Sequence, residues 1–127
     1  SYDNNPQIIN LNFNYDPAML LKIIEHVRIV HTAETAFTVY ADDWGKMYVT
    51  SSNTPVTVTI SSDVLWGTGQ LIYFQQAGVG EVNLVAGAGV TLQTPDATST
   101  RTQYSTICIV QTDTNTWACM GDLAYYA

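Results

Sequence analysis

Hydrophobic and polar residues alternate along most of the chain, in short runs of five to eight residues. Alternation with a period of two is typical of β-strands with one buried face, because successive side chains point to opposite sides of a sheet. From residue 35 onward the runs are AFTVY, KMYVTS, VTVTI, QLIYFQQ, EVNLVA, VTLQT, YSTICIVQ and TWACM. Asp, Gly, Pro and Ser residues separate them. The pattern predicts a mainly β protein, with an antiparallel β-sandwich or barrel over residues 35–127.

The runs differ in how many of their faces are apolar. VTVTI places three apolar residues on one face and two threonines on the other, which fits a strand with one buried side. CIVQ and TWACM carry apolar residues on both faces. Strands of that kind are covered on both sides, so we expect these two in the middle of the core or at an interface between subunits.

Residues 1–34 predict an N-terminal arm and one helix. Ile9, Leu11, Phe13 and Tyr15 alternate with asparagines, which indicates a strand with one apolar and one amide-bearing face. Such a strand is either an ordinary edge strand or an arm that adds to the sheet of a neighbouring subunit.

The helix is expected to follow the arm directly. Asp16 and Pro17 supply an N-cap and a first-turn proline, and apolar residues recur at helical spacing from Leu20. These signals predict a helix over residues 17–30. The last part of this stretch, HVRIVHTA, also suits a strand.

Three Gly-x-Gly pairs lie between the strand-like runs. They are Gly67 and Gly69, Gly78 and Gly80, and Gly87 and Gly89. Glycine reaches positive φ without steric cost, so the pairs predict hairpin turns or bulges between short strands. A phosphate-binding loop is disfavoured, because strand-like sequences follow the glycines where such a loop requires a helix.

Composition and charge narrow the classes of partner. The 127 residues suit one compact domain, only 12% of them are charged, and the net charge is -7. An acidic protein of this kind is repelled by nucleic acid and by anionic membranes. Apolar stretches are shorter than the roughly 20 residues of a membrane-spanning helix, and no signal peptide is recognisable. We therefore expect synthesis in the cytoplasm and no binding to nucleic acid or membranes.

Two cysteines are present, at positions 108 and 119. A four-residue loop that pairs Gln111 with Thr116 would place Cys108 opposite Cys119 on one face of a hairpin. The pair then forms either one disulfide or two small buried apolar side chains. The missing export signal favours two free thiols.

Residue types that carry catalysis or bind metals occur without the necessary spacing. His26 and His31 are five positions apart and do not share a helix face, and neither cysteine belongs to a CxxC motif. Asp42 and Asp43 are adjacent, unlike the alternating ligands of a calcium loop. No nucleophile-elbow sequence is present. The sequence therefore predicts no catalytic, cofactor-binding or metal-binding residues, and no enzyme activity.

Several motifs resemble a β domain of structural proteins of tailed bacteriophages. The matching residues cover about three quarters of the chain. They are Asp42 to Lys46, Val56 to Thr59, Gly67 to Thr68, Gln76 to Val82, Gly89 to Leu92, Tyr104 and Ser105, and Trp117 with Gly121 to Leu123. These are framework residues, so the resemblance bears on fold and biological setting more than on activity.

The resemblance implies a protein of the phage virion. Domains of this kind occur in tail fibres, tail spikes and head-decorating proteins, frequently as trimers. We predict a homotrimeric capsid decoration or cement protein that binds the major capsid protein on the capsid surface. The alternative is the receptor-binding tip of a tail fibre or spike, which would hold a host glycan. The residues expected at protein interfaces are Ile9, Leu11, Phe13, Tyr15, Tyr125 and Tyr126.

Overall fold

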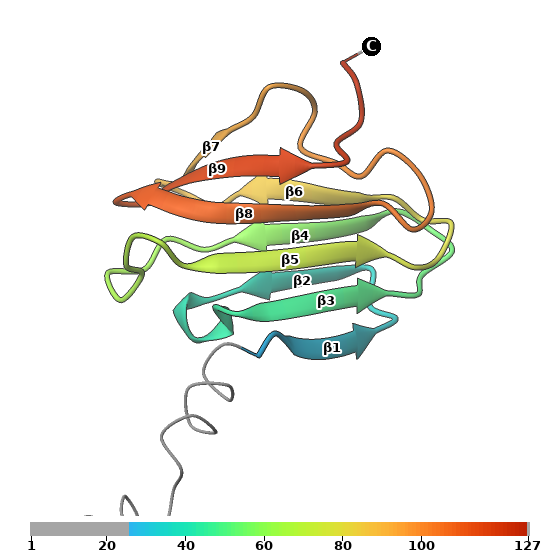
Figure 1. Cartoon of the computed structure of the whole chain (residues 1–127), viewed down its shortest axis with the longest axis horizontal. Helices are drawn as coiled ribbons and strands as arrows, with labels where there is room; N and C mark the ends of the chain where they lie inside the picture. The colour runs from blue at the N-terminus through green and yellow to red at the C-terminus, as the bar shows by residue number, and fades with distance from the viewer. Residues whose placement is uncertain (1–25, 127) are drawn as a thin grey trace, which may run out of the picture.

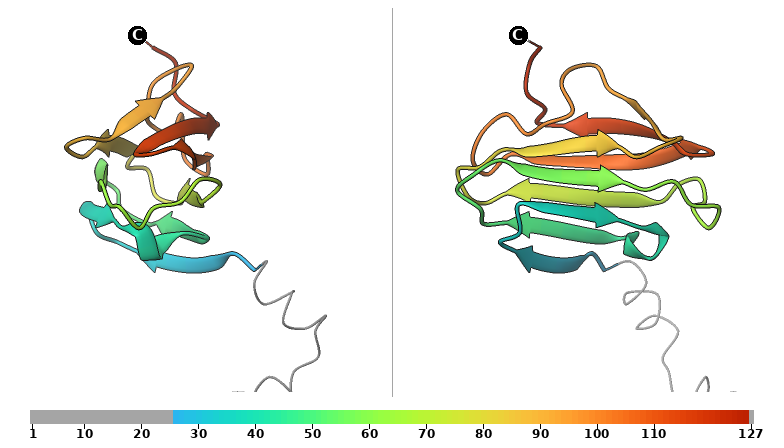
Figure 2. Two further views of the ribbon diagram at one scale, coloured as in Figure 1. Left: turned by 90° about the vertical axis from the view of Figure 1, so that its left-hand side faces the viewer. Right: turned by 180° about the vertical axis from the view of Figure 1, so that it is seen from behind.

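Two β-sheets lie face to face in the protein (Figures 1 and 2), as seen in a computed structural model that describes residues 26–126. Sheet A has six strands in the order β1-β3-β5-β8-β9-β7, and sheet B has three in the order β2-β4-β6. The strands are β1 (Arg28–Thr32), β2 (Ala36–Val39), β3 (Lys46–Thr50), β4 (Val56–Ile60), β5 (Leu71–Gln76), β6 (Val82–Ala86), β7 (Thr91–Gln93), β8 (Thr106–Asp113) and β9 (Thr116–Gly121). The mainly β prediction is confirmed, and each of the eight runs contains a strand.

The chain winds as a short solenoid. It passes from sheet A to sheet B and back three times, and the coils β1–β2, β3–β4 and β5–β6 stack on one another. The neighbouring strands within this stack are parallel. The predicted antiparallel arrangement is therefore wrong for most of the molecule, because strand patterns reveal which residues face the core but not which strands pair.

A hairpin interrupts the solenoid at its upper end in Figure 1. Strands β8 and β9 are antiparallel to each other and stand between β5 and β7 in sheet A. Strand β7, which continues the winding from β6, is thereby separated from β5 and pairs with β9. Sheet A is consequently twice as wide as sheet B.

The core fills the space between the sheets. Inward side chains from both sheets are almost fully buried, including Val56, Val58 and Ile60 of β4. An aromatic pair joins the connection between β4 and β5 to the hairpin: Trp66 meets Trp117 of β9 edge to face at a centroid distance of 4.8 Å. The apolar face predicted for VTVTI is thus confirmed as a core face.

Glycines at the corners allow the coils to approach each other. A Cβ atom on Gly78 would lie 2.1 Å from the carbonyl oxygen of Ser52, and one on Gly80 would lie 1.9 Å from that of Thr54. Both glycines belong to the connection between β5 and β6, which crosses directly over the connection between β3 and β4. The hairpin role predicted for this pair is wrong, since the connection joins the two sheets and its glycines serve close backbone contact.

The N-terminal helix prediction fails where the structure tests it. Arg28–Val30, the predicted end of the helix, lies in β1 and pairs with β3. The strand reading of HVRIVHTA is therefore the correct one for these residues. The remainder of the predicted helix and the predicted arm strand lie outside the described residues.

The segment of residues 94–103, which connects β7 to β8, closes the upper end of sheet B. Ser99 and Thr100 are buried, and the backbone of 98–100 bonds to β6 on one side. Ala124 and Asp122 bond to the same segment from the other side. The edge of β6 is therefore covered.

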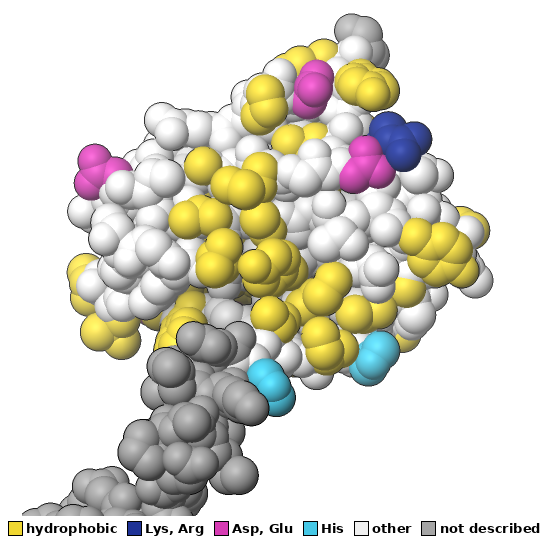
Figure 3. All heavy atoms as spheres, in the orientation of Figure 1, with side chains coloured by type: hydrophobic (Ala, Val, Ile, Leu, Met, Phe, Trp, Pro, Cys, Tyr) yellow, Lys and Arg dark blue, Asp and Glu magenta, His cyan; other side chains and the backbone are white. Residues whose placement is uncertain are grey.

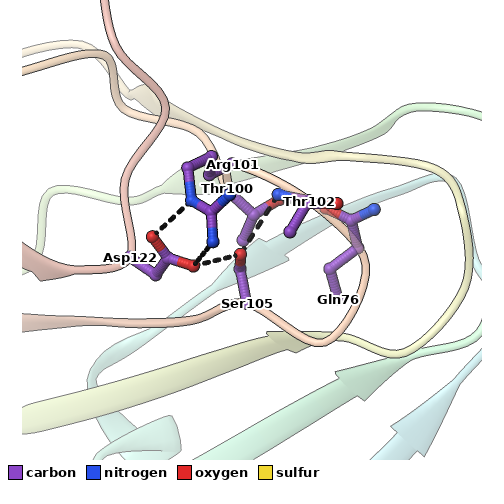
Figure 4. A network of polar contacts seen from close by, with 6 residues as sticks. All are labelled: Gln76, Thr100, Arg101, Thr102, Ser105 and Asp122. Carbon is purple, nitrogen blue, oxygen red and sulfur yellow. Dashed lines mark hydrogen bonds and ion pairs between the residues drawn. The ribbon is translucent and has the colours of Figure 1, made fainter.

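A polar network anchors this closure (Figure 4). The Asp122 carboxylate accepts two hydrogen bonds from Arg101, at 2.8 and 3.0 Å, and one from the Ser105 hydroxyl at 2.7 Å. Nearby, buried Thr100 donates to the Gln76 side-chain oxygen at 2.6 Å. Three of the phage-like motifs, containing Gln76, Ser105 and Asp122, thus meet in one region. Their residues hold the closure together, as expected of framework residues.

Candidate subunit interface

The outer face of sheet A carries an apolar row across five strands. In the register of the sheet, an outward side chain of each strand is paired with an outward side chain of the neighbouring strand. The row consists of Ile29, Met47, Tyr73, Cys108 and Met120. Its end members Ile29 and Met120 are 53% and 43% exposed, and the middle three are partly exposed. Figure 3 shows the resulting band of apolar side chains across this face.

Of the two flanking rows, one is apolar and the other is mostly polar, and neither contains Lys, Arg, Asp or Glu. On one side Leu71, Val110 and Ala118 are register partners, and on the other Val49 lies between His31 and Gln75. Formally charged side chains appear only near the margins of this view in Figure 3. An apolar band without Lys, Arg, Asp or Glu is typical of a surface that another protein covers.

Sheet B presents a different outer face. Its outward positions bring Ala36, Thr57 and Asn83 together in one row and Thr38, Thr59 and Val85 in the next. Small hydroxyl and amide side chains of this kind suit contact with water. The contrast indicates that the two faces have different environments in the functional protein, and that the outer face of sheet A is the interface candidate.

The cysteines lie on opposite sides of sheet A. Cys108 pairs with Met120, and Cys119 pairs with Ile109, so Cys108 points outward and Cys119 into the core. Both are free thiols. The prediction that they face each other is wrong, because an irregularity between Gln111 and Asp113 shifts the register by one residue. Burial raises the pKa of both thiols, that of Cys119 to about 11.

The interface residues predicted from the sequence are not among those of the described apolar row, and their role stays a prediction. Ile9, Leu11, Phe13 and Tyr15 lie outside the described residues. Tyr125 and Tyr126 are 76% and 65% exposed and follow β9. The signal for this candidate surface was the pair of runs with two apolar faces, and its positions in β1, β3 and β5 were not predicted.

Residues 26–126 contain no candidate metal-binding cluster. No group of three or more His, Cys, Asp and Glu side chains there is arranged to hold a metal ion. His31 lies in β1 on the outer face of sheet A. No helix among the residues described is long and apolar enough to cross a membrane.

The Asp43 carboxylate, between β2 and β3, is held by a hydrogen bond and an ion pair. It belongs to the 3₁₀ helix η1 (Ala41–Asp43), accepts the Tyr40 backbone N–H at 2.8 Å, and forms an ion pair with Lys46 at 2.7 Å. Burial alone would raise its pKa, but the bonds from Lys46 and Tyr40 outweigh burial and hold the pKa below the ordinary value of 3.8. The same carboxylate and burial raise the pKa of Tyr48.

Acid should therefore weaken the fold partly through Asp43. A carboxyl group with a depressed folded-state pKa stabilises the fold above its unfolded pKa, and this contribution is lost as pH falls through the folded pKa. We expect the free energy of unfolding to decrease as the pH is lowered from about 5 to about 2. In Asp43→Asn this decrease should be smaller by on the order of 1–2 kcal/mol. Urea unfolding at a series of pH values measures it. The neighbouring Asp42→Asn variant is the control, and equal acid sensitivity of Asp43→Asn and the unmodified protein would contradict the assignment.

No protein-family model matches this sequence, and a search of curated proteins finds no similar sequence. The resemblance to phage proteins therefore remains a prediction from the motifs. The geometry of the two sheet faces is the independent ground on which a function can be proposed.

Proposed function

We propose that this protein is a structural subunit of a tailed-bacteriophage virion, a homotrimeric decoration or cement protein on the capsid surface. The observation that carries the proposal is the outer face of sheet A, which is apolar and uncharged while the outer face of sheet B is rich in threonine. The phage-like motifs supply the biological setting.

Self-association is the simplest use of this face. Three copies arranged about one axis would each bury the row from Ile29 to Met120 and remove it from water. Burying apolar area contributes roughly 25 cal/mol per Å² before the costs of association, so each side chain of the row that the contact covers favours association. The net charge of -7 is carried elsewhere on each subunit and keeps the assembly soluble.

The proposed mechanism is passive. A trimer would sit at a local threefold position of the shell, contact neighbouring major capsid proteins, and resist the outward pressure of packed DNA. The arm with Ile9, Leu11, Phe13 and Tyr15 is proposed to contact capsid sheets through backbone hydrogen bonds. No chemical step is required, in agreement with the predicted lack of enzyme activity.

Electron cryo-microscopy of virions that contain this protein tests the proposal. We expect trimeric density that fits two-sheet subunits on the outer surface of the head. Density for the chain at a tail fibre or spike would overturn the decoration role.

A binding experiment distinguishes the cement protein from the alternative, a receptor-binding tip. A receptor-binding tip should retain a specific glycan on an array without any capsid present, whereas the cement protein should bind empty capsid shells and no glycan. Trp44, 46% exposed and with the Arg28 guanidinium 5.7 Å from its ring centre, is the aromatic residue to replace if a glycan is found. Specific glycan binding together with no binding to shells would favour the tail role.

A further inference from the structure

The two ends of the solenoid differ in whether the edges of their strands are covered. At the upper end the backbone of residues 98–100 covers the edge of β6. At the lower end, which we call the open end, β1 and β2 are the edge strands of their sheets. No other strand among residues 26–126 pairs with their outer edges. Solenoid ends usually need a cap, because each coil buries its apolar side chains only against its neighbours.

In β1, the backbone N–H and C=O groups of alternate residues point away from the stack of coils. Arg28 donates to Gly45 and Thr32 accepts from Ser51, so the groups of these residues face β3. By the alternation of a parallel strand, the amides of Ile29 and His31 face outward. The edge is therefore ready to accept a further segment of chain.

Apolar side chains of the core reach the open end. The rings of Phe74, Tyr48 and Phe37 form a column with centroid distances of 5.8 and 5.0 Å, one ring from each coil. Phe74 is fully buried, whereas Phe37 at the end of the column and Val30 beside it are only partly buried. Together they line a recess of about 510 Å³ between β1 and β2.

The rim of the recess is acidic. Glu34, Asp42 and Asp43 lie around the apolar floor. Asp43 is paired with Lys46, but two open ends facing each other would bring the carboxylates of Glu34 and Asp42 together, which disfavours a second copy in the same position. The occupant should therefore be apolar and close to neutral.

The chain carries such a segment immediately before the open end. Residues 17–25, with the sequence PAMLLKIIE, contain six apolar residues besides proline and one charge of each sign. The described chain begins at His26, two residues before β1. So short a tether gives the segment a very high effective concentration at the recess.

We propose that residues 17–25 of the same chain form the cap of the open end, with their apolar side chains over Val30 and Phe37. The cap covers the exposed end of the aromatic column in the way that residues 98–100 cover the upper end. It also assigns the N-terminal region two roles, since the arm at residues 9–15 stays available for other contacts. This inference does not depend on the phage assignment.

Cysteine cross-linking in the full chain tests the proposal. In a Cys108→Ala, Cys119→Ala background, Ile24→Cys is combined with Phe37→Cys, and mild oxidation is followed by peptide mass spectrometry. The control combines Ile24→Cys with Val85→Cys, an exposed position on the outer face of sheet B. We expect at least tenfold more disulfide for Phe37→Cys than for Val85→Cys.

Mixing isotope-labelled and unlabelled chains before oxidation identifies the source of the segment. A cap within one chain gives disulfides between peptides of the same label only. Mixed-label disulfides would show that the segment comes from a neighbouring copy and would overturn the proposal, as would equal yields for the two cysteine pairs.

Discussion

Replacing Gly80 with alanine is expected to lower the free energy of unfolding by about 3 kcal/mol or more, or to prevent folding. The new methyl group would lie 1.9 Å from the carbonyl oxygen and 2.4 Å from the carbonyl carbon of Thr54. Backbone atoms form this obstacle, so no side-chain rotation can relieve the clash. The crossing between the second and third coils would have to open.

Gly67→Ala is the matched control for this prediction. A Cβ atom at Gly67 meets only the side-chain nitrogen of Gln70, at 3.6 Å, and the residue does not have a positive φ. We expect its free energy of unfolding to change by less than about 1 kcal/mol. Denaturant unfolding followed by circular dichroism measures both variants. A Gly80→Ala protein as stable as Gly67→Ala would show that the coils do not cross as described.

Introducing a charge on the outer face of sheet A should dissociate the proposed trimer. Met120→Asp puts a carboxylate at one end of the apolar row, and burying it without a partner would cost several kcal/mol in each subunit. Because Met120 is 43% exposed in the single chain, the fold itself should tolerate the change. We expect light scattering to report a single chain of 14.0 kDa where the unmodified protein gives three times that mass.

Val85→Asp provides the comparison. Val85 is 45% exposed and lies on the outer face of sheet B, so the substitution and the exposure are matched and only the sheet differs. We expect this variant to remain trimeric and to bind capsid shells as the unmodified protein does. Dissociation by Val85→Asp with an intact Met120→Asp trimer would move the interface to the other sheet, and an unmodified protein of 14.0 kDa would refute the trimer.

The alternation of residues was sufficient to find the strands but not their partners. VTVTI shows which side chains face the core, and those side chains do so in the structure. Nothing in that alternation distinguishes a chain that turns back beside itself from one that crosses to an opposite sheet. The glycines around Gly78 looked like hairpin residues for the same reason, since a turn and a tight crossing both require glycine.

Register was the second limit on prediction. The hairpin of β8 and β9 was expected, yet one irregularity at Gln111 reversed the relation of Cys108 to Cys119. The same limit hid most of the candidate interface on sheet A. The apolar nature of both faces of CIVQ and TWACM was visible in the sequence, but the alignment of Cys108 with Tyr73, and onward across sheet A, depends on register.

The position of β9 has a mechanical consequence. Strand β9 lies between β8 and β7, with hydrogen bonds on both sides, while β1 pairs with a strand on one side only within residues 26–126. A force applied through the C-terminus must shear two ladders at once, whereas a force applied through β1 can open its single ladder one bond at a time. The protein should therefore withstand far more tension when pulled from its C-terminal end than when it is peeled from β1, which single-molecule pulling from each end would measure.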